Sequence, residues 1–287
     1  MDVVRDVASL RAAVASARAR GERIGFVPTM GALHAGHLSL IERARDACDC
    51  VVLSIFVNPL QFAPTEDLAT YPRTEQDDIA AAAPRGATLA FVPPVEVMYP
   101  GPRAISVVPD SIAERWEGAI RPGHFAGVLT VVAKLFNLVQ PDVAVFGQKD
   151  LQQATLIRAL VRDLDFPLTL DIAPIVREAD GLAMSSRNRY LDGDQRRAAR
   201  ALSQALVTIA GAHAAGITAA DVLVAQGDAR LRTESIVRAD YLSIVDPVRL
   251  EPVTSAADGD YVILAARVGR TRLLDNHRLG DPLPTLS

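Results

Sequence analysis

The chain contains few of the features that mark secreted, metal-binding or membrane-spanning proteins. Its 287 residues include only two cysteines, Cys48 and Cys50, whose spacing does not match the usual ligand pattern of a zinc site. The low cysteine content and the lack of a signal-peptide pattern predict a reducing, cytoplasmic location. No apolar run reaches the roughly 20 residues that a bilayer-spanning helix needs. We therefore expect a soluble protein without a membrane partner.

Long blocks of like charge are also missing. The net charge is −4 at pH 7 and the basic residues are scattered, which argues against a nucleic-acid partner. Neither a repeat nor a low-complexity tract interrupts the sequence. Hydrophobic residues make up 49% of the chain, so a globular protein is expected, and 287 residues exceed what one compact core usually organises. Two domains are therefore predicted.

Strand-like and helix-like segments alternate over residues 1–175. The predicted strands cover residues 24–27, 51–57, 88–92, 105–108, 143–146 and 168–172. The predicted helices cover residues 6–20, a segment that begins near 34–37, and residues 74–83, 121–139 and 151–164. This alternation predicts an α/β fold with a doubly wound, Rossmann-like parallel sheet. Residues 176–287 predict a smaller α+β domain, with a frayed tail after Leu279.

The most informative stretch is residues 24–38, IGFVPTMGALHAGHL, which predicts a strand, a glycine-containing loop and a helix start. A helix start presents unpaired N–H groups and a positive dipole end, which suit phosphate oxygens. His34 and His37, two of only five histidines, can lie on the same side of that start. Two neutral donors there could stabilise a phosphoryl-transfer transition state. The same spacing is also typical of surface histidines or capping partners.

Other polar residues each allow two interpretations. Asp77 and Asp78 could hold a magnesium ion or simply complement a helix dipole. Lys149 follows a predicted strand, and could bind a triphosphate or be an ordinary surface charge. The polar segment 176–191 could be a mobile loop that contacts phosphates and closes over a substrate, or a solvated interdomain linker.

The predicted helix 121–139 is apolar on all sides except at Lys134. Such a helix is buried by a core or by a partner. Arg121 and His124 lie at its start, where they could contact a phosphate or cap the helix.

Six segments together resemble the pantothenate synthetase (pantoate:β-alanine ligase) family of the HxGH nucleotidyltransferase superfamily. They are PTMGALHAGHLSLI, FVNPLQF, YPRTEQDD, RPGHFAGVLTVVAKL, FGQKDLQQ and READGLAMSSRNRYL. They occur in the order of the family, and the resemblance extends from about Gly25 to Asn276. One position departs from it: Gln148 stands where the family has glutamate in FGEKD, which removes a negative charge beside Lys149.

The resemblance implies an enzyme that uses ATP and Mg²⁺ to join pantoate to β-alanine through a pantoyl adenylate, with release of pyrophosphate and AMP. The catalytic residues that it implies are His34, His37, Lys149, Ser185, Ser186 and Arg187. The ATP-binding residues that it implies are Pro28, Thr29, Met30, His34, Gly36, His37, Gly147, Lys149, Asp150, Val176, Met184, Ser185, Ser186 and Arg187. The pantoate-binding residues that it implies are Met30, Gln61 and Gln153, and the residue near the metal is Asp77.

The resemblance also implies a homodimer, with residues 1–175 as the ATP- and pantoate-binding domain and residues 176–287 as a lid domain. Two other functions compete with it. An HxGH enzyme that adenylylates a phosphate monoester needs another acceptor pocket, and Gln61 with Gln153 better suits a small hydroxy acid. A nucleotide-sensing module without turnover has no need for both histidines together with Lys149 and the serine-arginine segment.

Overall fold

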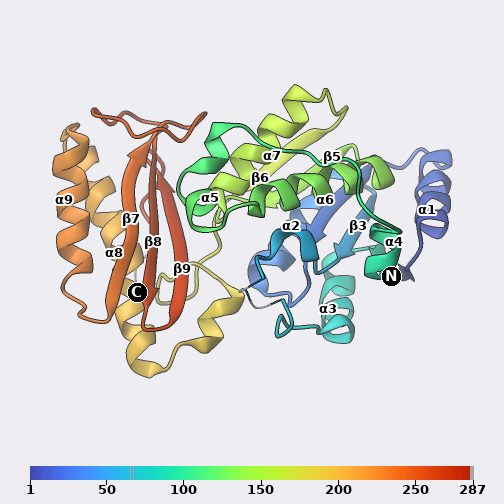
Figure 1. Ribbon diagram of the computed structural model, residues 1–287, viewed down its shortest axis with the longest axis horizontal. Helices are drawn as coiled ribbons and strands as arrows, with labels where there is room; N and C mark the ends of the chain where they lie inside the picture. The colour runs from blue at the N-terminus through green and yellow to red at the C-terminus, as the bar shows by residue number, and fades with distance from the viewer. Residues whose placement is uncertain (65, 67, 285–287) are drawn as a thin grey trace. The chain divides into compact units, whose positions relative to one another are not determined.

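The computed structural model describes residues 1–64, 66 and 68–284, which form two compact units (Figure 1). Unit 1 comprises Met1–Gln148 and Gln152–Pro174, and unit 2 comprises Lys149–Leu151 and the described residues from Ile175 onward. The sequence predicted a domain boundary after residue 175, and in the structure the main boundary between the units lies after Pro174. The roles of the two units as a substrate-binding domain and a lid stay predictions.

Unit 1 is built on a six-stranded sheet in which every pair of neighbouring strands is parallel. Its order is β1 (Asp2–Val4), β4 (Leu89–Phe91), β3 (Cys50–Ile55), β2 (Ile24–Thr29), β5 (Val143–Gly147) and β6 (Thr169–Ala173). From β2 the chain runs outward through β3 and β4, and then returns to β5 on the other side of β2. The strand order therefore reverses between β2 and β5, as in a doubly wound sheet.

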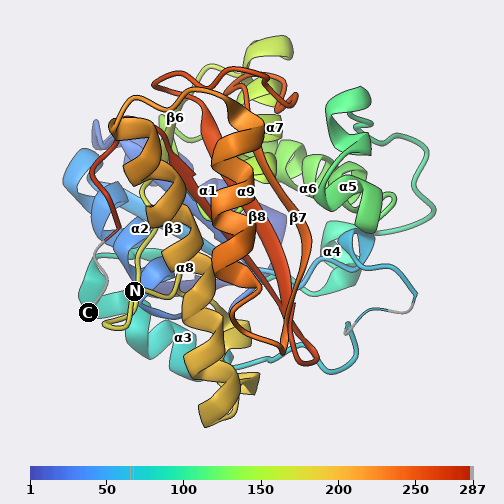
Figure 2. The ribbon, with the colours of Figure 1, turned by 90° about the vertical axis from the view of Figure 1, so that its left-hand side faces the viewer.

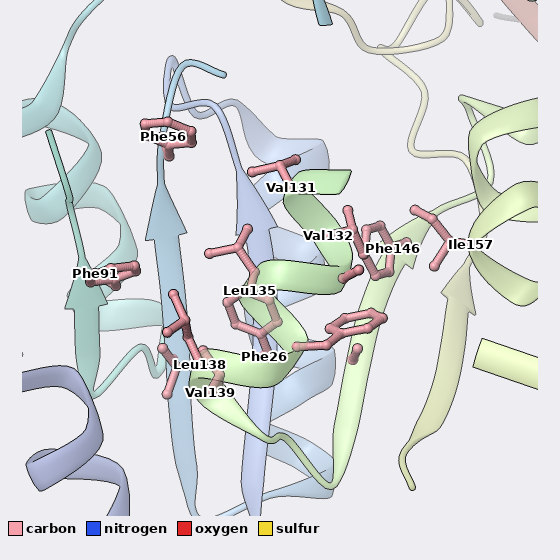
Figure 3. Packing of buried hydrophobic residues seen from close by; sticks show 14 of the residues in the cluster. Phe26, Phe56, Phe91, Val131, Val132, Leu135, Leu138, Val139, Phe146 and Ile157 are labelled. Carbon is pink, nitrogen blue, oxygen red and sulfur yellow. The ribbon is translucent and has the colours of Figure 1, made fainter. Parts of the chain in front are cut away.

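Helices cover both faces of this sheet because neighbouring residues of a strand point to opposite faces. On one face, α1 (Val7–Ala19) and α6 (His124–Val139) share a core with Phe26, Phe91 and Phe146, and Figure 3 shows the side chains of α6 packed against it. On the other face, α2 (Ala35–Ala47) packs on Val27, Leu53 and Val145. The other α-helices described in unit 1 are α3 (Glu75–Ala82), α4 (Val95–Met98), α5 (Glu117–Ile120) and α7 (Leu151–Asp163), although the first residue of α7 is assigned to unit 2.

The predicted helix 121–139 is shorter than expected at its start. It begins at His124, because Gly123 at the N-cap takes a left-handed φ of 82°. Buried residues occur all around α6, among them Leu129, Val132 and Phe136. Each large apolar side chain that is fully buried contributes about 1.5–3 kcal/mol. The helix is thus covered by its own unit, and its apolar character does not require a partner.

The predicted strand at residues 105–108 is wrong, and a strand at the N-terminus was missed. Residues 105–108 have no strand structure, and Ile105 and Val108 are 83% and 76% exposed. Prolines flank this segment, and the N–H of Val107 bonds to the hydroxyl of Thr130 at 3.0 Å instead of to a strand. β1 was missed because three residues that include an aspartate give no strand signal, and only the pairing with β4 makes them a strand.

Unit 2 is the small α+β domain that the sequence predicted. Its antiparallel sheet has the order β7 (Val237–Val245), β8 (Tyr261–Val268) and β9 (Thr271–Arg278). Figure 2 shows α8 (Gly193–Ala214) and α9 (Ala220–Leu231) lying against this sheet, and a single apolar cluster joins them to it. The tail predicted to fray begins after Leu279, and its last three residues, 285–287, lie outside the described residues.

Within the described residues, no helix has both the length and the apolar character that crossing a bilayer requires.

Candidate active site

The loop between β2 and α2 carries His34 and His37 at the start of the helix. His34 is the N-cap of α2, and its Nδ1 accepts the N–H of Gly36 at 3.2 Å. The Nδ1 of His37 accepts the N–H of His34 at 3.4 Å, and the two ring centroids are 4.1 Å apart. Because each Nδ1 accepts a backbone N–H, a neutral ring carries its proton on Nε2. The histidines are therefore capping partners whose Nε2–H groups are donors.

Asp78 holds this histidine loop (residues 30–37) from the neighbouring helix α3. Its side chain is buried, and its two oxygens accept the backbone N–H groups of Ala32 at 2.9 Å and Leu33 at 2.7 Å. Ala32 has a φ of 51°, which is strained for a residue with a Cβ. Gly31 has a φ of 82°, and a Cβ there would lie 2.9 Å from an oxygen of Asp78. The carboxylate therefore fixes a loop conformation that the chain would not adopt alone.

The pairing of Asp77 with Asp78 as magnesium ligands has little structural support. The oxygens of Asp78 are engaged by backbone N–H groups, whereas Asp77 is exposed in the first turn of α3. Among the described residues, no group of three or more His, Cys, Asp or Glu side chains could hold a metal ion. The role of Asp77 near magnesium therefore stays a prediction.

Gln61 lies at the end of a short 3-10 helix (Pro59–Gln61) that follows β3. Its Oε1 accepts the Nδ2–H of Asn58 at 3.1 Å, and its Nε2–H points to the Sδ of Met30 at 3.0 Å. Asn58 also donates to the carbonyl of Gly127 in α6 at 3.1 Å. A Cβ at Gly127 would run into the backbone of Leu60. The structure thus brings together Met30 and Gln61, two of the three residues predicted to bind pantoate.

Arg121 and His124 support this same turn. Arg121 makes two bonds to the carboxylate of Glu66, at 2.7 and 2.8 Å, and these hold the pKa of Glu66 below its usual range. Arg121 also donates to the Nε2 of His124 at 3.0 Å, so the Nδ1–H of His124 donates to the carbonyl of Gln61 at 2.8 Å. In the described structure, both residues hold the backbone that presents Gln61.

Gln153 and its neighbour Gln152 have different surroundings at the start of α7. Gln152 is buried, accepts the N–H of Glu117 at 3.0 Å and donates to the carbonyls of Ile112 and Arg115 at 2.8 and 2.9 Å. It therefore shapes the segment that leads into α5. Gln153 is partly exposed, and its predicted contact with pantoate stays a prediction.

The other predicted residues of unit 1 lie where β2 and β5 end. Thr29 donates to the carbonyl of Ser54 at 2.8 Å and accepts the N–H of Gly31 at 3.1 Å. Gly147 ends the neighbouring strand β5, and Pro28 and Thr29 end β2. The carboxyl ends of parallel strands meet at one edge, and the point where the strand order reverses is the usual ligand site of such sheets. The histidine loop begins at that point.

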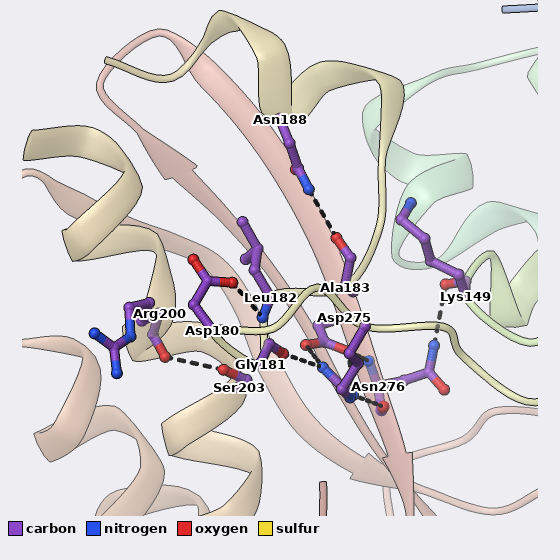
Figure 4. Close-up of polar contacts among 11 residues, drawn as sticks. Lys149, Asp180, Gly181, Leu182, Ala183, Asn188, Arg200, Ser203, Asp275 and Asn276 are labelled. Atoms are coloured by element: carbon purple, nitrogen blue, oxygen red, sulfur yellow. Dashed lines mark hydrogen bonds and ion pairs between the residues drawn. The ribbon is translucent and has the colours of Figure 1, made fainter. Parts of the chain in front are cut away.

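Lys149 and Asp150 belong to unit 2. The carbonyl of Lys149 accepts the Nδ2–H of Asn276, a residue of β9, at 3.0 Å (Figure 4). The Nζ of Lys149 lies 3.7 Å from a carboxylate oxygen of Asp150, and the lysine side chain is 20% exposed. Asn276 was not recognised from the sequence, because nothing local relates it to a residue more than a hundred positions earlier.

The serine-arginine hairpin (residues 176–190) is tied to the rest of unit 2. Met184 and Val176 are joined by a backbone bond of 2.9 Å, so two predicted ATP-binding residues lie side by side. Arg177 makes a two-bond ion pair with the buried Asp275, at 2.7 and 2.9 Å. The Oγ of Ser185 accepts the N–H of Arg187 at 3.2 Å and starts a 3-10 helix (Ser186–Tyr190).

The other end of the hairpin is held by Arg196 near the start of α8. Arg196 bonds to Asp180 at 2.8 Å and to Glu178 at 2.6 Å, and these bonds raise the pKa of the guanidinium and lower that of Asp180. Asn188 donates to Glu178 at 2.6 Å and to the carbonyl of Ala183 at 3.0 Å. These side chains have defined partners within unit 2. The movement over a substrate that the sequence allowed for this segment stays a prediction.

Comparisons with known proteins identify the family of the chain. The family model described as pantoate-beta-alanine ligase matches residues 2–278. The pantothenate synthetase of Koribacter versatilis is 50% identical over 276 residues, which cover 96% of this chain and 95% of the relative. The pantothenate synthetase of Sphingopyxis alaskensis is 49% identical over 98% of this chain and all of its own length.

Two solved structures share the fold. The pantothenate synthetase of Thermus thermophilus has a TM-score of 0.92 and 47% identity, covering 97% of this chain and 99% of its own. The pantoate-beta-alanine ligase of Francisella tularensis, solved with beta-gamma ATP and beta-alanine, has a TM-score of 0.78 and 31% identity, covering 98% and 99%. With a family match and relatives that both extend over nearly the whole sequence, the chain belongs to the pantoate-beta-alanine ligase family and is a ligase.

Proposed function

We propose that this protein condenses pantoate with β-alanine in two steps. The carboxylate of pantoate attacks the α-phosphorus of ATP, which forms pantoyl adenylate and releases pyrophosphate. The amine of β-alanine then attacks the acyl carbon, which gives pantothenate and releases AMP. The observation that carries the proposal is the pair of imidazoles anchored through Nδ1 at a helix start, where the strand order of a parallel sheet reverses.

The proposed roles follow from the chemistry of each group. The Nε2–H donors of His34 and His37 and the ammonium of Lys149 stabilise the charge that builds up on the α-phosphate. Ser185, Ser186 and Arg187 bind phosphate oxygens without any change of protonation. No covalent enzyme nucleophile is required, because carboxylate attack on phosphorus needs alignment and charge stabilisation only.

The remaining predicted residues are proposed to bind the substrates. Gln61, Gln153 and Met30 receive pantoate, since an amide offers donors to a carboxylate and a hydroxyl. The proposed ATP contacts are those of Pro28, Thr29, Met30, Gly36, Gly147, Asp150, Val176 and Met184. Magnesium commonly uses one or two carboxylates together with substrate phosphates, and Asp77 is the exposed carboxylate proposed to contribute, where the ion would neutralise phosphate charge.

AMP release that depends on both pantoate and β-alanine is the decisive assay. With ATP labelled at the α-phosphate, we expect labelled AMP only when both acids are present. With pantoate alone, pyrophosphate should appear as a burst of about one per site and then nearly stop, because the adenylate is kept from water. Transfer of the label to a phosphate monoester would identify a different nucleotidyltransferase. ATP binding without any product would identify a nucleotide sensor.

We further propose that the protein acts in the cytoplasm as a homodimer. The family resemblance supports the dimer, and so do the exposed apolar side chains of Ile105 and Val108. The apolar character of α6 does not, because that helix is buried in its own unit. Light scattering after size exclusion should give twice the mass of the chain, and a monomer at micromolar concentration would contradict the proposal.

A further inference from the structure

Asn58 is a buried amide whose orientation is fixed by groups that each have only one hydrogen-bonding role. Its Oδ1 lies 3.2 Å from the N–H of Leu60, which can only donate. Its Nδ2 lies 3.1 Å from the carbonyl of Gly127, which can only accept. These two contacts assign which end of the amide is oxygen and which is nitrogen, and the second hydrogen of Nδ2 faces Gln61. The Oε1 of Gln61, 3.1 Å away, is the acceptor.

Tyr99 adds a donor to the other side of the same amide. Its hydroxyl lies 2.8 Å from the Oδ1 of Asn58. The ring packs near Phe56, with centroids 6.0 Å apart, and the Nζ of Lys134 lies 5.8 Å from the ring centroid. Burial raises the pKa of Tyr99 to about 12, so the hydroxyl keeps its proton at neutral pH. The sequence alone does not indicate this contact, because Tyr99 lies 41 positions after Asn58 in the chain, directly after the four-residue helix α4.

We propose that Tyr99 is a positioning residue that acts through Asn58 to present Gln61 to the substrate as a hydrogen-bond donor. The relay runs from the hydroxyl of Tyr99 to Oδ1 of Asn58, and from Nδ2 of Asn58 to Oε1 of Gln61. It leaves the Nε2–H group of Gln61 at the far end. The inference rests on the function proposed above, because it requires that the Nε2–H of Gln61 donates to an oxygen of pantoate.

The contact that Nε2 makes in this structure shows why a ligand would be favoured. Nε2 lies 3.0 Å from the sulfur of Met30, and a thioether is a weak acceptor. A carboxylate or hydroxyl oxygen is a stronger acceptor, and a charge-assisted bond is about twice as strong as a neutral one. If Gln61 could rotate its amide by 180°, Oε1 would face the carboxylate instead and repel it. The relay therefore favours a ligand that presents an oxygen acceptor to Nε2, and a carboxylate most of all.

The test is calorimetric binding of pantoate and of ATP, measured separately, to Tyr99→Phe. This variant keeps the ring and its packing, and removes only the hydroxyl. We expect the Kd of pantoate to rise about fivefold, the range that one lost neutral hydrogen bond gives, with the Kd of ATP unchanged within about twofold. Tyr261→Phe in β8 is the matched control and should alter neither.

A double-mutant cycle with Gln61→Ala distinguishes the relay from a general loosening of the site. In the Gln61→Ala background, Tyr99→Phe should have no further effect on pantoate binding, because the group through which it acts is gone. An equal, additive loss in both backgrounds, or equal losses for pantoate and ATP, would overturn the relay while leaving the proposed function intact. If the unaltered protein does not bind pantoate, the proposed function itself fails, and the relay with it.

Discussion

The histidine loop of unit 1 and the serine-arginine hairpin of unit 2 both carry residues proposed to contact phosphate, yet they are held by different means. The loop is fixed by backbone N–H groups that bond to the two imidazoles and to Asp78. The hairpin is fixed by ion pairs, and Arg177 and Asp275 are 98 positions apart. The bonds of the two imidazoles join residues two and three positions apart and leave a pattern in the sequence. The bonds of Asp78, 45 and 46 positions away, and the distant ion pair of Arg177 leave none.

This difference has a mechanical consequence for unit 2. Asp275 holds the hairpin through Arg177, and the next residue, Asn276, holds the carbonyl of Lys149 (Figure 4). We expect any movement of the hairpin to carry Lys149 with it, because both are bonded to adjacent residues of β9. Closure over a reactive adenylate, which the sequence predicted as the motion of a loop, would then be a motion of these groups together.

The largest effect on the rate of the reaction is expected for Lys149→Ala. Losing one donor that acts in the transition state costs about 2.7–4 kcal/mol, or roughly 10²–10³ in rate. Single-turnover formation of pyrophosphate from ATP and pantoate measures this directly. Lys149→Arg keeps the charge and should lose less. A near-normal rate for the alanine variant would remove Lys149 from the mechanism, and would leave the histidine loop as the main source of phosphate stabilisation.

Asp275→Asn should break the anchor of the hairpin. The variant leaves the guanidinium of Arg177 beside a neutral amide, and removing one partner of a buried pair costs about 3–5 kcal/mol. Hydrogen exchange should rise in residues 176–190, with little change in residues 30–37. Asp258→Asn is the control, because the side chain of Asp258 is 81% exposed and its pair with His213 is worth little. Equal exchange in both variants would mean that the hairpin is held by something else.

Asp78→Asn tests the corresponding anchor of the histidine loop. An amide nitrogen would face at least one buried backbone N–H, at a cost of about 1–3 kcal/mol. Both the melting temperature and kcat should fall, because the loop that carries His34 loses its support. Asp77→Asn should leave the melting temperature unchanged, but raise the Mg²⁺ concentration needed for activity. If the two variants behave alike, the structural difference between these neighbouring carboxylates has no functional meaning.

The elements that the sequence predicted well are those with local causes. The apolar strand cores and the helix start at His34 follow from periodicity and from glycine positions, and the parallel sheet follows from their alternation. Tyr99, Asn58 and Asp275 could not be recognised, because each acts through a partner that only the folded chain brings near. The strand predicted at residues 105–108 is wrong because their composition suits a strand, but no described strand pairs with them.

The smallest effect, and the one that separates the two units by pH, is expected at His277 in β9. The ring is buried, and its Nε2 has no hydrogen-bond partner among the described residues. Burial lowers the pKa of His277, and the positive charge of Arg177 acts in the same direction, while Asp281 and Asp275 oppose it. A histidine whose pKa is lowered on folding binds fewer protons in the folded state than in the unfolded one.

The stability that the neutral His277 supplies is therefore fully present above its unfolded pKa, near 6.5, and is lost as the pH falls through the lower folded value. The ion pair of Glu66 in unit 1 also weakens on acidification, but only below about pH 4.5, since its pKa is lowered from that value. Between these limits, acid should destabilise unit 2 before unit 1. Unfolding of unit 1 can be followed by the fluorescence of Trp116, the only tryptophan, and unit 2 by hydrogen exchange in β9. His277→Gln should abolish the loss of protection that begins below about pH 6.5, and an unchanged pH dependence in that variant would show that another group is responsible.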